Sequence, residues 1–218
     1  MRMVDAAPSR VGPSLSDSVL RHLRRAIING TLPPGERLLE ADLADQFHVS
    51  RATIRQALGQ LGVEGLAEVR PGRGAVVTRM SGKVARDICT VRGLLEGWAA
   101  RTACVTLEAV QIQRMHGLGE EMGTALRAGN IVQVVELDIE FHTFICASDP
   151  NERLNMHWAS LNASHGALMS SRLVHYNPIT VIDLHIHLCD ELATRDPDRA
   201  EAAVRAHYMG ARWEGDEE

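Results

Sequence analysis

The chain has 218 residues, of which 45% are hydrophobic, and a formal net charge of −5. This length suffices for two domains of unequal size, and the hydrophobic fraction excludes global disorder. No apolar run is long enough to cross a bilayer, and residues 1–13 lack the apolar core of a signal peptide. We therefore expect a cytoplasmic protein with no membrane partner.

The charge is unevenly distributed along the chain. Residues 1–80 carry 11 Lys and Arg against 8 Asp and Glu, a net of +3, whereas residues 81–218 carry 12 against 20, a net of −8. The acidic excess belongs to the second part and leaves the first part free to approach phosphate groups. This asymmetry permits DNA binding without establishing it.

The chain begins with a Pro/Ser/Gly-rich stretch over 1–13, which we expect to be a flexible arm. Ser14 or Ser16 can cap a helix that reaches about Asn29, with one apolar stripe along it. Gly30 and the turn that follows, with its two prolines, end this helix.

Two further helices and a hairpin are predicted next. The helices cover about 39–47 and 51–64, with a break between them, and the short strands cover 66–70 and 75–78. Helix, helix, turn, helix and hairpin is the outline of a winged helix-turn-helix, which we assign to residues 14–79.

The third helix opens with side chains suited to DNA. Arg51 and Arg55 lie four residues apart and share a face, with Thr53 between them near the tip. The free N–H groups of a helix N-terminus favour phosphate, and arginine can pair bidentately with guanine in the major groove. Arg73, in the hairpin, could reach a minor groove or a phosphate. The alternative, a solvated basic helix start, is less favoured in the second helix of a helix-turn-helix.

Beyond a linker at residues 80–83, every long segment has the period of a helix. Short connections with Gly-Asn, Asp-Pro and Asn-Pro pairs imply antiparallel neighbours. The protein should therefore be mainly α, and residues 84–214 should form an antiparallel bundle of about six helices. These are expected over roughly 83–104, 106–128, 130–147, 151–173, 178–194 and 197–214.

Four polar residues of this second domain form a candidate metal site. Asp138 and His142 share one helical face at i, i+4, and His185 and His207 lie on two later helices among apolar residues. One carboxylate oxygen and three imidazoles suit a divalent metal such as Zn²⁺, Ni²⁺ or Mn²⁺. By spacing alone the signal is weak, because a single histidine on an apolar face is usually a satisfied core residue.

Neighbouring histidine and cysteine residues are interpreted as non-ligands. His187 is two residues from His185 and should point to another face, at the surface or behind the ligands. Cys146 and Cys189 each lie one turn beyond a proposed ligand and could offer a thiolate, but we favour small-residue packing. With the other two cysteines they form no Cys-x-x-Cys pair, so we expect all four to be reduced and buried.

The N-terminal motifs resemble a known family. Over about residues 14–78 the chain is similar to the DNA-binding domain of the GntR family of transcription regulators. The resemblance implies that Arg51, Thr53 and Arg55 contact bases and phosphates, with Ala52 backing them and Gly72 at the wing tip. Ala52-Thr53-Ile54 replaces a common Thr-Pro-Val, so no operator sequence is implied. The motifs are Gly30-Thr31-Leu32-Pro33-Pro34-Gly35-Glu36-Arg37-Leu38-Leu39-Glu40, Val49-Ser50-Arg51, Arg55-Gln56-Ala57-Leu58, Glu64-Gly65-Leu66 and Arg73-Gly74.

The second domain resembles the ligand-binding (FCD-type) domain of the FadR subfamily over about residues 84–210. The motifs are Val91-Arg92-x-x-Leu95-Glu96, Asp138-x-x-x-His142, His185 and His207. The resemblance implies that Asp138, His142, His185 and His207 bind a divalent metal, with Zn²⁺ the preferred candidate. It also implies a small organic-acid effector at open metal positions, with Arg92 as a candidate partner for its carboxylate. The alternative for Arg92 is a salt bridge with Glu96. Six helices would be similar to the VanR-like branch, although Leu184 replaces a usual Glu.

These observations predict a homodimeric transcription regulator. Two recognition helices would read the half-sites of an inverted repeat in double-stranded operator DNA. Effector binding in the acidic bundle would change the placement of the two DNA-binding domains. The alternatives are a metal-dependent hydrolase and a regulator whose metal is purely structural. Glu140 is the candidate base of such a hydrolase, but it lies on another helical face.

Overall fold

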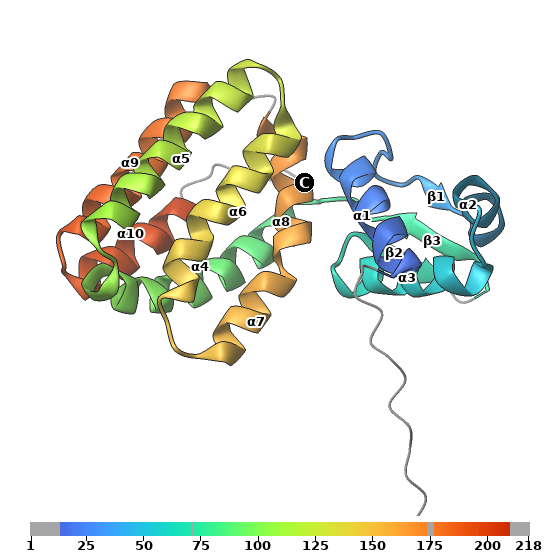
Figure 1. The fold of residues 1–218 in the computed structure, drawn as a ribbon, viewed down its shortest axis with the longest axis horizontal. Helices are drawn as coiled ribbons and strands as arrows, with labels where there is room; N and C mark the ends of the chain where they lie inside the picture. Colours follow the sequence, from blue (N-terminus) through green and yellow to red (C-terminus); the bar gives the residue numbers. More distant parts are fainter. Residues whose placement is uncertain (1–13, 71, 174–176, 210–218) are drawn as a thin grey trace, which may run out of the picture.

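The structure is a computed structural model that describes residues 14–70, 72–173 and 177–209. It arranges them in two bodies, a small N-terminal head and a larger helical body (Figure 1). The arm expected over 1–13 and the final part of the last helix, 210–214, lie outside the described residues. Among the residues described, no helix is long and apolar enough to span a membrane.

The head has the predicted winged helix-turn-helix with one additional strand. β2 and β3 form the wing, and β1, for which the sequence shows no periodic signal, pairs with the other edge of β3. All pairs are antiparallel, in the order β1-β3-β2. The elements are α1 (Leu15–Ile28), β1 (Arg37–Leu38), α2 (Glu40–Phe47), α3 (Arg51–Val63), β2 (Ala67–Arg70) and β3 (Gly74–Val77).

Local sequence signals account for the ends of these elements. Of the two candidate caps, Ser14 caps α1, in a capping box with Asp17. His48 ends α2 in the left-handed conformation, and Ser50 caps α3. Gly74 has a φ of +81°, and a Cβ there would lie 2.1 Å from the Leu38 carbonyl oxygen, so only glycine lets β1 approach β3.

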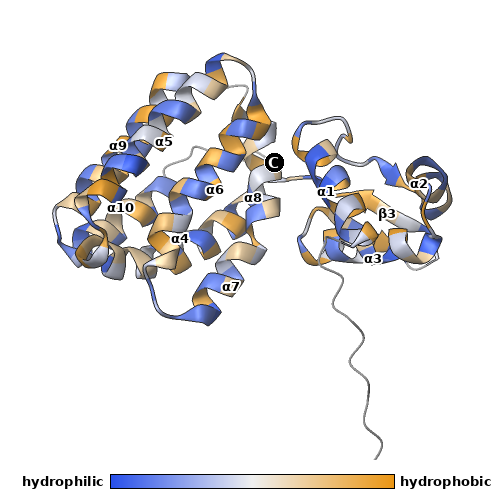
Figure 2. Cartoon of the chain, viewed as in Figure 1, coloured by the Kyte–Doolittle hydropathy of each residue, from blue (hydrophilic) through white to orange (hydrophobic). Residues whose placement is uncertain are grey.

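The body is a bundle whose helices begin and end close to the predicted positions, with one exception. Each helix carries hydrophobic and hydrophilic residues, as Figure 2 shows, and most of the buried hydrophobic ones form one core cluster. α4 begins inside the expected linker 80–83. The helices are α4 (Gly82–Thr106), α5 (Ala109–Arg127), α6 (Ile131–Ala147), α7 (Glu152–Ser160), α8 (Asn162–Leu173), α9 (Pro178–Ala193) and α10 (Pro197–Met209).

The exception is the helix expected over 151–173, which is divided into α7 and α8 at Leu161. The Leu161 N–H donates to the Trp158 carbonyl, an i→i−3 bond that tightens the last turn of α7. Trp158 and Asn162, on either side of the break, each hydrogen-bond to a buried charged residue of α4. The described part of the body therefore has seven helices, and the VanR-like assignment, which rests on six, gains no support.

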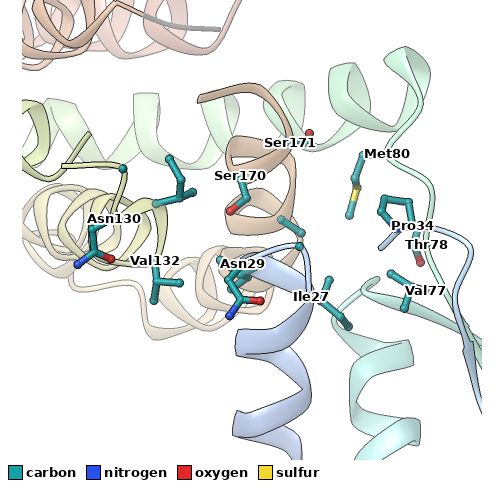
Figure 3. A pocket seen from close by; sticks show the side chains of 15 residues that line it. Ile27, Asn29, Pro34, Val77, Thr78, Met80, Asn130, Val132, Ser170 and Ser171 are labelled. Carbon is teal, nitrogen blue, oxygen red and sulfur yellow. The ribbon is translucent and has the colours of Figure 1, made fainter. Parts of the chain in front are cut away.

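α8 lies on the side of the body that faces the head (Figure 1). Its Ala167 is buried in the hydrophobic cluster of the head, and Ala163 packs against that cluster. A crevice of about 530 Å³ lies beside this contact, lined by the end of α1, the linker, the α5–α6 turn and the end of α8 (Figure 3). α1 of the head also contacts α6, so the two bodies meet through α8 and α6 of the body.

Candidate functional site

The expected DNA-contacting residues lie together at the start of α3 and in the wing. Arg51 and Ala52 are exposed in the first turn of α3, where the Ser50 hydroxyl accepts a hydrogen bond from the Thr53 N–H at 3.1 Å. This cap leaves other N–H groups of the helix end available to a phosphate. Gly72 and Arg73 are exposed at the wing turn.

Arg55, also exposed, has a partner within the head that the sequence reasoning missed. Its Nε and Nη2 donate to the two carboxylate oxygens of Glu40 at 3.1 and 2.8 Å. Glu40 is the first residue of α2, so the pair joins the two helices of the helix-turn-helix. The hydrogen bond from Arg55 lowers the pKa of Glu40, which is therefore ionised at neutral pH.

In the body, α6, α9 and α10 bring three of the predicted metal ligands together. Ligand atoms of His142, His185 and His207 all lie within 4.8 Å of one another. The ring centroids are 5.7 Å apart for the first two, and His207 lies 5.2 and 5.0 Å from them. In the described part of the chain this is the one cluster whose donor atoms converge in this way.

Hydrogen bonds orient two of these rings. The Nδ1 of His142 lies 2.6 Å from Glu96 Oε2, and the Nδ1 of His185 lies 2.7 Å from the Val181 carbonyl oxygen. In each ring Nδ1–H is the donor, so Nε2 is the atom that would face a metal. Burial would lower the pKa of His142, but Glu96 and Asp138 outweigh this and raise it to about 9, so its Nε2 would give up a proton to a metal. His142 Nε2 and His207 Nδ1 are buried without a hydrogen-bond partner. Buried, unpartnered ring nitrogens fit a metal ion well.

Asp138, the fourth predicted ligand, lies against the same histidines. Its Oδ1 is 3.3 Å from His185 Nε2 and 3.6 Å from His142 Nε2, and the side chain is buried. Burial raises the pKa of Asp138, but the adjacent His142 outweighs this and holds the pKa well below its usual value. The group is therefore a carboxylate that can offer an oxygen to a metal.

His165, on α8, belongs to this cluster and was missed by the sequence reasoning. Its Nδ1 lies 3.7 Å from Asp138 Oδ2, and neither atom has a hydrogen-bond partner. Burial is the main cause that lowers the pKa of His165 to about 3, so the ring is neutral. It stands among small residues in the sequence, and no spacing signal connects it with Asp138.

Arg92 is fully buried, shares Glu96 with His142 of the histidine cluster, and makes the salt bridge that its alternative interpretation expected. Its Nη2 lies 2.9 Å from Glu96 Oε1, while Nη1 donates to Asn162 and Nε to Tyr208. Glu96 also accepts from Trp158 and Tyr208. Burial would raise the pKa of Glu96, but His142 and Arg92 together lower it to about 2.

The residues interpreted as non-ligands are placed accordingly. His187 is exposed, and all four cysteines are buried and form no disulfide. Burial raises the pKa of the Cys189 thiol to about 12, so it stays protonated at neutral pH. Glu140, the base of the hydrolase alternative, is bonded to Arg114 at the surface, 3.0 Å away, and does not join the cluster.

Two known families together cover most of the chain. Residues 15–77 match the family described as bacterial regulatory proteins, gntR family, and residues 87–210 match the FCD domain. The FCD match alone covers more than half of the sequence. Both matches coincide with the ranges in which the sequence motifs occur.

Curated relatives are similar over nearly the whole chain. The Nta operon transcriptional regulator of Aminobacter aminovorans is 30% identical, over 81% of this chain and 82% of that protein. The HTH-type transcriptional repressor RspR of Escherichia coli is 24% identical, over 89% and 86%. Among solved structures, E. coli McbR/YncC has a TM-score of 0.74 at 22% identity, over 91% and 95%, which supports the fold. The matched families and relatives are transcription regulators rather than enzymes.

Proposed function

We propose that this chain, which belongs to the GntR family of bacterial regulatory proteins, modulates its binding to operator DNA through a divalent metal ion and a small carboxylate in its FCD domain. That it is a DNA-binding transcription regulator follows from the two family matches and the relatives. The metal, the carboxylate, the named contacts and the domain limits (14–79, linker 80–83, 84–214) are the proposed part.

The observation that carries the metal proposal is the convergence of His142, His185 and His207 within 4.8 Å. Asp138 supplies an oxygen beside them, and three imidazoles with one carboxylate suit Zn²⁺ first and Ni²⁺ or Mn²⁺ next. Glu96 would accept the hydrogen bond from His142 Nδ1–H and so keep the proton on Nδ1, which leaves Nε2 to the metal. When bound, the metal supplies positive charge and open positions for an anionic ligand.

A small carboxylate is the effector class that this chemistry favours. A bound metal would attract an anion, and His165 Nδ1 is buried 3.7 Å from Asp138 Oδ2 without a hydrogen-bond partner of its own. Arg92 is already paired with Glu96, so we propose that it adds positive charge and one N–H rather than a free bidentate fork.

A purely structural metal is the second candidate. The observation that favours it is the complete burial of His142 and the near-complete burial of Asp138 and His185. A structural ion would stabilise the bundle and respond to no carboxylate. Response to an organic acid therefore separates the two candidates.

We propose that α8 connects the metal cluster with the head. One face of the helix presents His165 to Asp138, and the roughly opposite face, two residues on, places Ala167 in the hydrophobic cluster of the head. A ligand that shifts His165 would move Ala167 with it, because both lie on one rigid helix. This would alter the placement of α3 relative to the body and so the affinity for DNA.

We further propose that the regulator is a homodimer on an inverted-repeat operator. α4 exposes a stripe of apolar side chains, Val91, Leu94 and Trp98, at the i, i+3, i+7 spacing of one helix face. A second copy of the chain is the proposed occupant, because a self-complementary apolar stripe suits a two-fold interface. Two copies would present two recognition helices, with Arg51, Thr53, Arg55 and the wing on each half-site.

Elemental analysis combined with a thermal-shift screen tests the sensor proposal. We expect the purified chain to hold a divalent metal. We also expect at least one of acetate, lactate, malate, citrate and gluconate to raise the melting temperature with metal present but not after chelation. Bound metal with no response to any acid would favour the structural role, and an equal response after chelation would contradict a metal-centred effector site.

A further inference from the structure

We propose that Glu40 is a positioning residue that sets the specificity of Arg55 for guanine. The inference rests on the proposed role of Arg55 in DNA recognition. Glu40 accepts hydrogen bonds from Nε and Nη2 of Arg55, at 3.1 and 2.8 Å. Two planar groups joined by two parallel bonds share one plane, so the carboxylate fixes the orientation of the guanidinium.

The remaining donors of Arg55 are those that read guanine. A guanidinium has five N–H groups, and Glu40 occupies the one on Nε and one on Nη2. The two on Nη1 and the second on Nη2 stay free, and this edge of the fork pairs bidentately with O6 and N7 of guanine. The pair with Glu40 and a pair with guanine are therefore compatible.

Glu40 is the more buried residue of the pair, and Arg55 is the more exposed one, which leaves it accessible to DNA. The Glu40 side chain is 17% exposed and that of Arg55 is 66% exposed. Glu40 is also the first residue of α2, where the helix dipole favours a carboxylate. A long arginine without this anchor would sample many rotamers before reaching a base, which costs entropy.

The same carboxylate opposes binding to DNA of arbitrary sequence. A negative charge beside Arg51 and Arg55 reduces the attraction of the α3 N-terminus for phosphate, the attraction that dominates non-specific binding. Removing the charge should therefore strengthen non-specific binding while it weakens the reading of guanine. These opposite signs distinguish positioning from a merely structural contact, whose loss would weaken both.

The head contains a second ion pair of the same geometry that serves as a control. Arg24 donates from Nε and Nη2 to the carboxylate of Glu64, at 2.9 and 2.6 Å. This pair joins α1 to the C-terminal cap of α3, at the opposite end from the proposed DNA contacts. Loss of this ion pair should lower the stability of the head without changing its preference for one DNA sequence over another.

The test compares full-length wild type, E40Q, E64Q and R55A by fluorescence anisotropy at several salt concentrations. The probes are the duplex that wild type selects from a random-sequence library and a scrambled duplex of the same composition. For E40Q we expect the ratio of selected to scrambled affinity to fall by about tenfold or more, with tighter binding to the scrambled duplex. For E64Q we expect the wild-type ratio.

The outcomes separate this inference from the proposed function. If R55A binds the selected duplex as wild type does, the assignment of Arg55 fails, and the inference fails with it. If R55A loses affinity while E40Q keeps the wild-type ratio, only the role of Glu40 is overturned. Should E40Q not fold, E40D tests the positioning alone: its shorter side chain withdraws the carboxylate from Arg55 but keeps the charge, so the affinity ratio should fall without tighter binding to the scrambled duplex.

Discussion

The Nδ1 atom of His142 lies 2.6 Å from Oε2 of Glu96, although 46 residues separate them in the sequence. α4 supplies the carboxylate and α6 the imidazole, and both side chains are fully buried. This one contact ties the candidate metal cluster to the buried Arg92–Glu96 pair. It therefore connects the metal, the charge beside it and the longest helix of the body.

Replacing Glu96 with Gln should weaken metal binding. The variant loses the carboxylate that orients His142, and we expect the affinity for Zn²⁺ to fall by roughly 10–100-fold. Calorimetric titration of the metal-free chain with Zn²⁺ measures this. Glu140→Gln, which alters an exposed ion pair on the same domain, is the matched control and should keep the wild-type affinity. If E96Q and wild type bind Zn²⁺ with equal affinity, Glu96 does not orient His142 for metal binding.

Removing a ligand should abolish the metal-dependent part of the stability. For His185→Ala we expect loss of bound metal and a melting temperature that no longer changes on chelation. For wild type, chelation should lower the free energy of unfolding by roughly 3 kcal/mol when the metal is at about a hundred times its Kd.

His187→Ala is the control for this experiment, because His187 is exposed and only two residues away. It should retain the metal and the full response to chelation. Loss of metal in H187A with retention in H185A would reverse the assignment. Elemental analysis of both variants after gel filtration decides between them.

Ala167→Glu should disconnect the head from the body. The new charge would disrupt the contact between α8 and the hydrophobic cluster of the head, while the metal ligands stay in place. Metal content should be unchanged. The effector should lose its effect on operator affinity, which for a coupled pair of sites is typically about 5–150-fold.

Ala159→Glu, at an exposed position of α7, is the matched control and should keep the full effect. Anisotropy titrations with and without the acid found in the thermal-shift screen measure both variants. An unchanged effector response in A167E would mean that α8 is not the connection.

Trp98→Glu should disrupt the proposed dimer. Trp98 is 58% exposed and is the largest side chain of the apolar stripe on α4, so a carboxylate there would be buried without a partner in a two-fold interface. We expect the dimer dissociation constant to rise by roughly 30-fold or more, as for an interface hot spot. Light scattering after gel filtration measures the mass, and V110E, at an exposed apolar position of α5, should remain dimeric. An unchanged mass of W98E would place the interface elsewhere.

Sequence patterns predicted most of the fold because the informative signals are local. Caps such as Ser14 and Ser50 and the helical period set the limits of most elements. β1 was missed because a strand of two residues shows no periodic pattern. The break at Leu161 was missed because it depends on the hydrogen bonds that Trp158 and Asn162 make with α4.

The residues of the proposed metal site were predictable from the sequence, and the residues around them were not. Asp138 and His142 share a helical face, His185 and His207 stand among apolar residues on two later helices, and the family resemblance strengthened this set of four. Glu96 as a partner of His142, and His165 beside Asp138, come from helices packed side by side, and no spacing in one sequence reports such a contact. The Glu40–Arg55 pair, across 15 residues, was missed for the same reason.

The operator affinity of the wild-type chain under three conditions tests the central claim most directly. The dissociation constant for the selected duplex is measured with Zn²⁺ alone, with Zn²⁺ and the organic acid that raised the melting temperature, and with the acid after chelation. The account predicts a change in affinity with metal and acid together that chelation abolishes. The same affinity in all three conditions would contradict it.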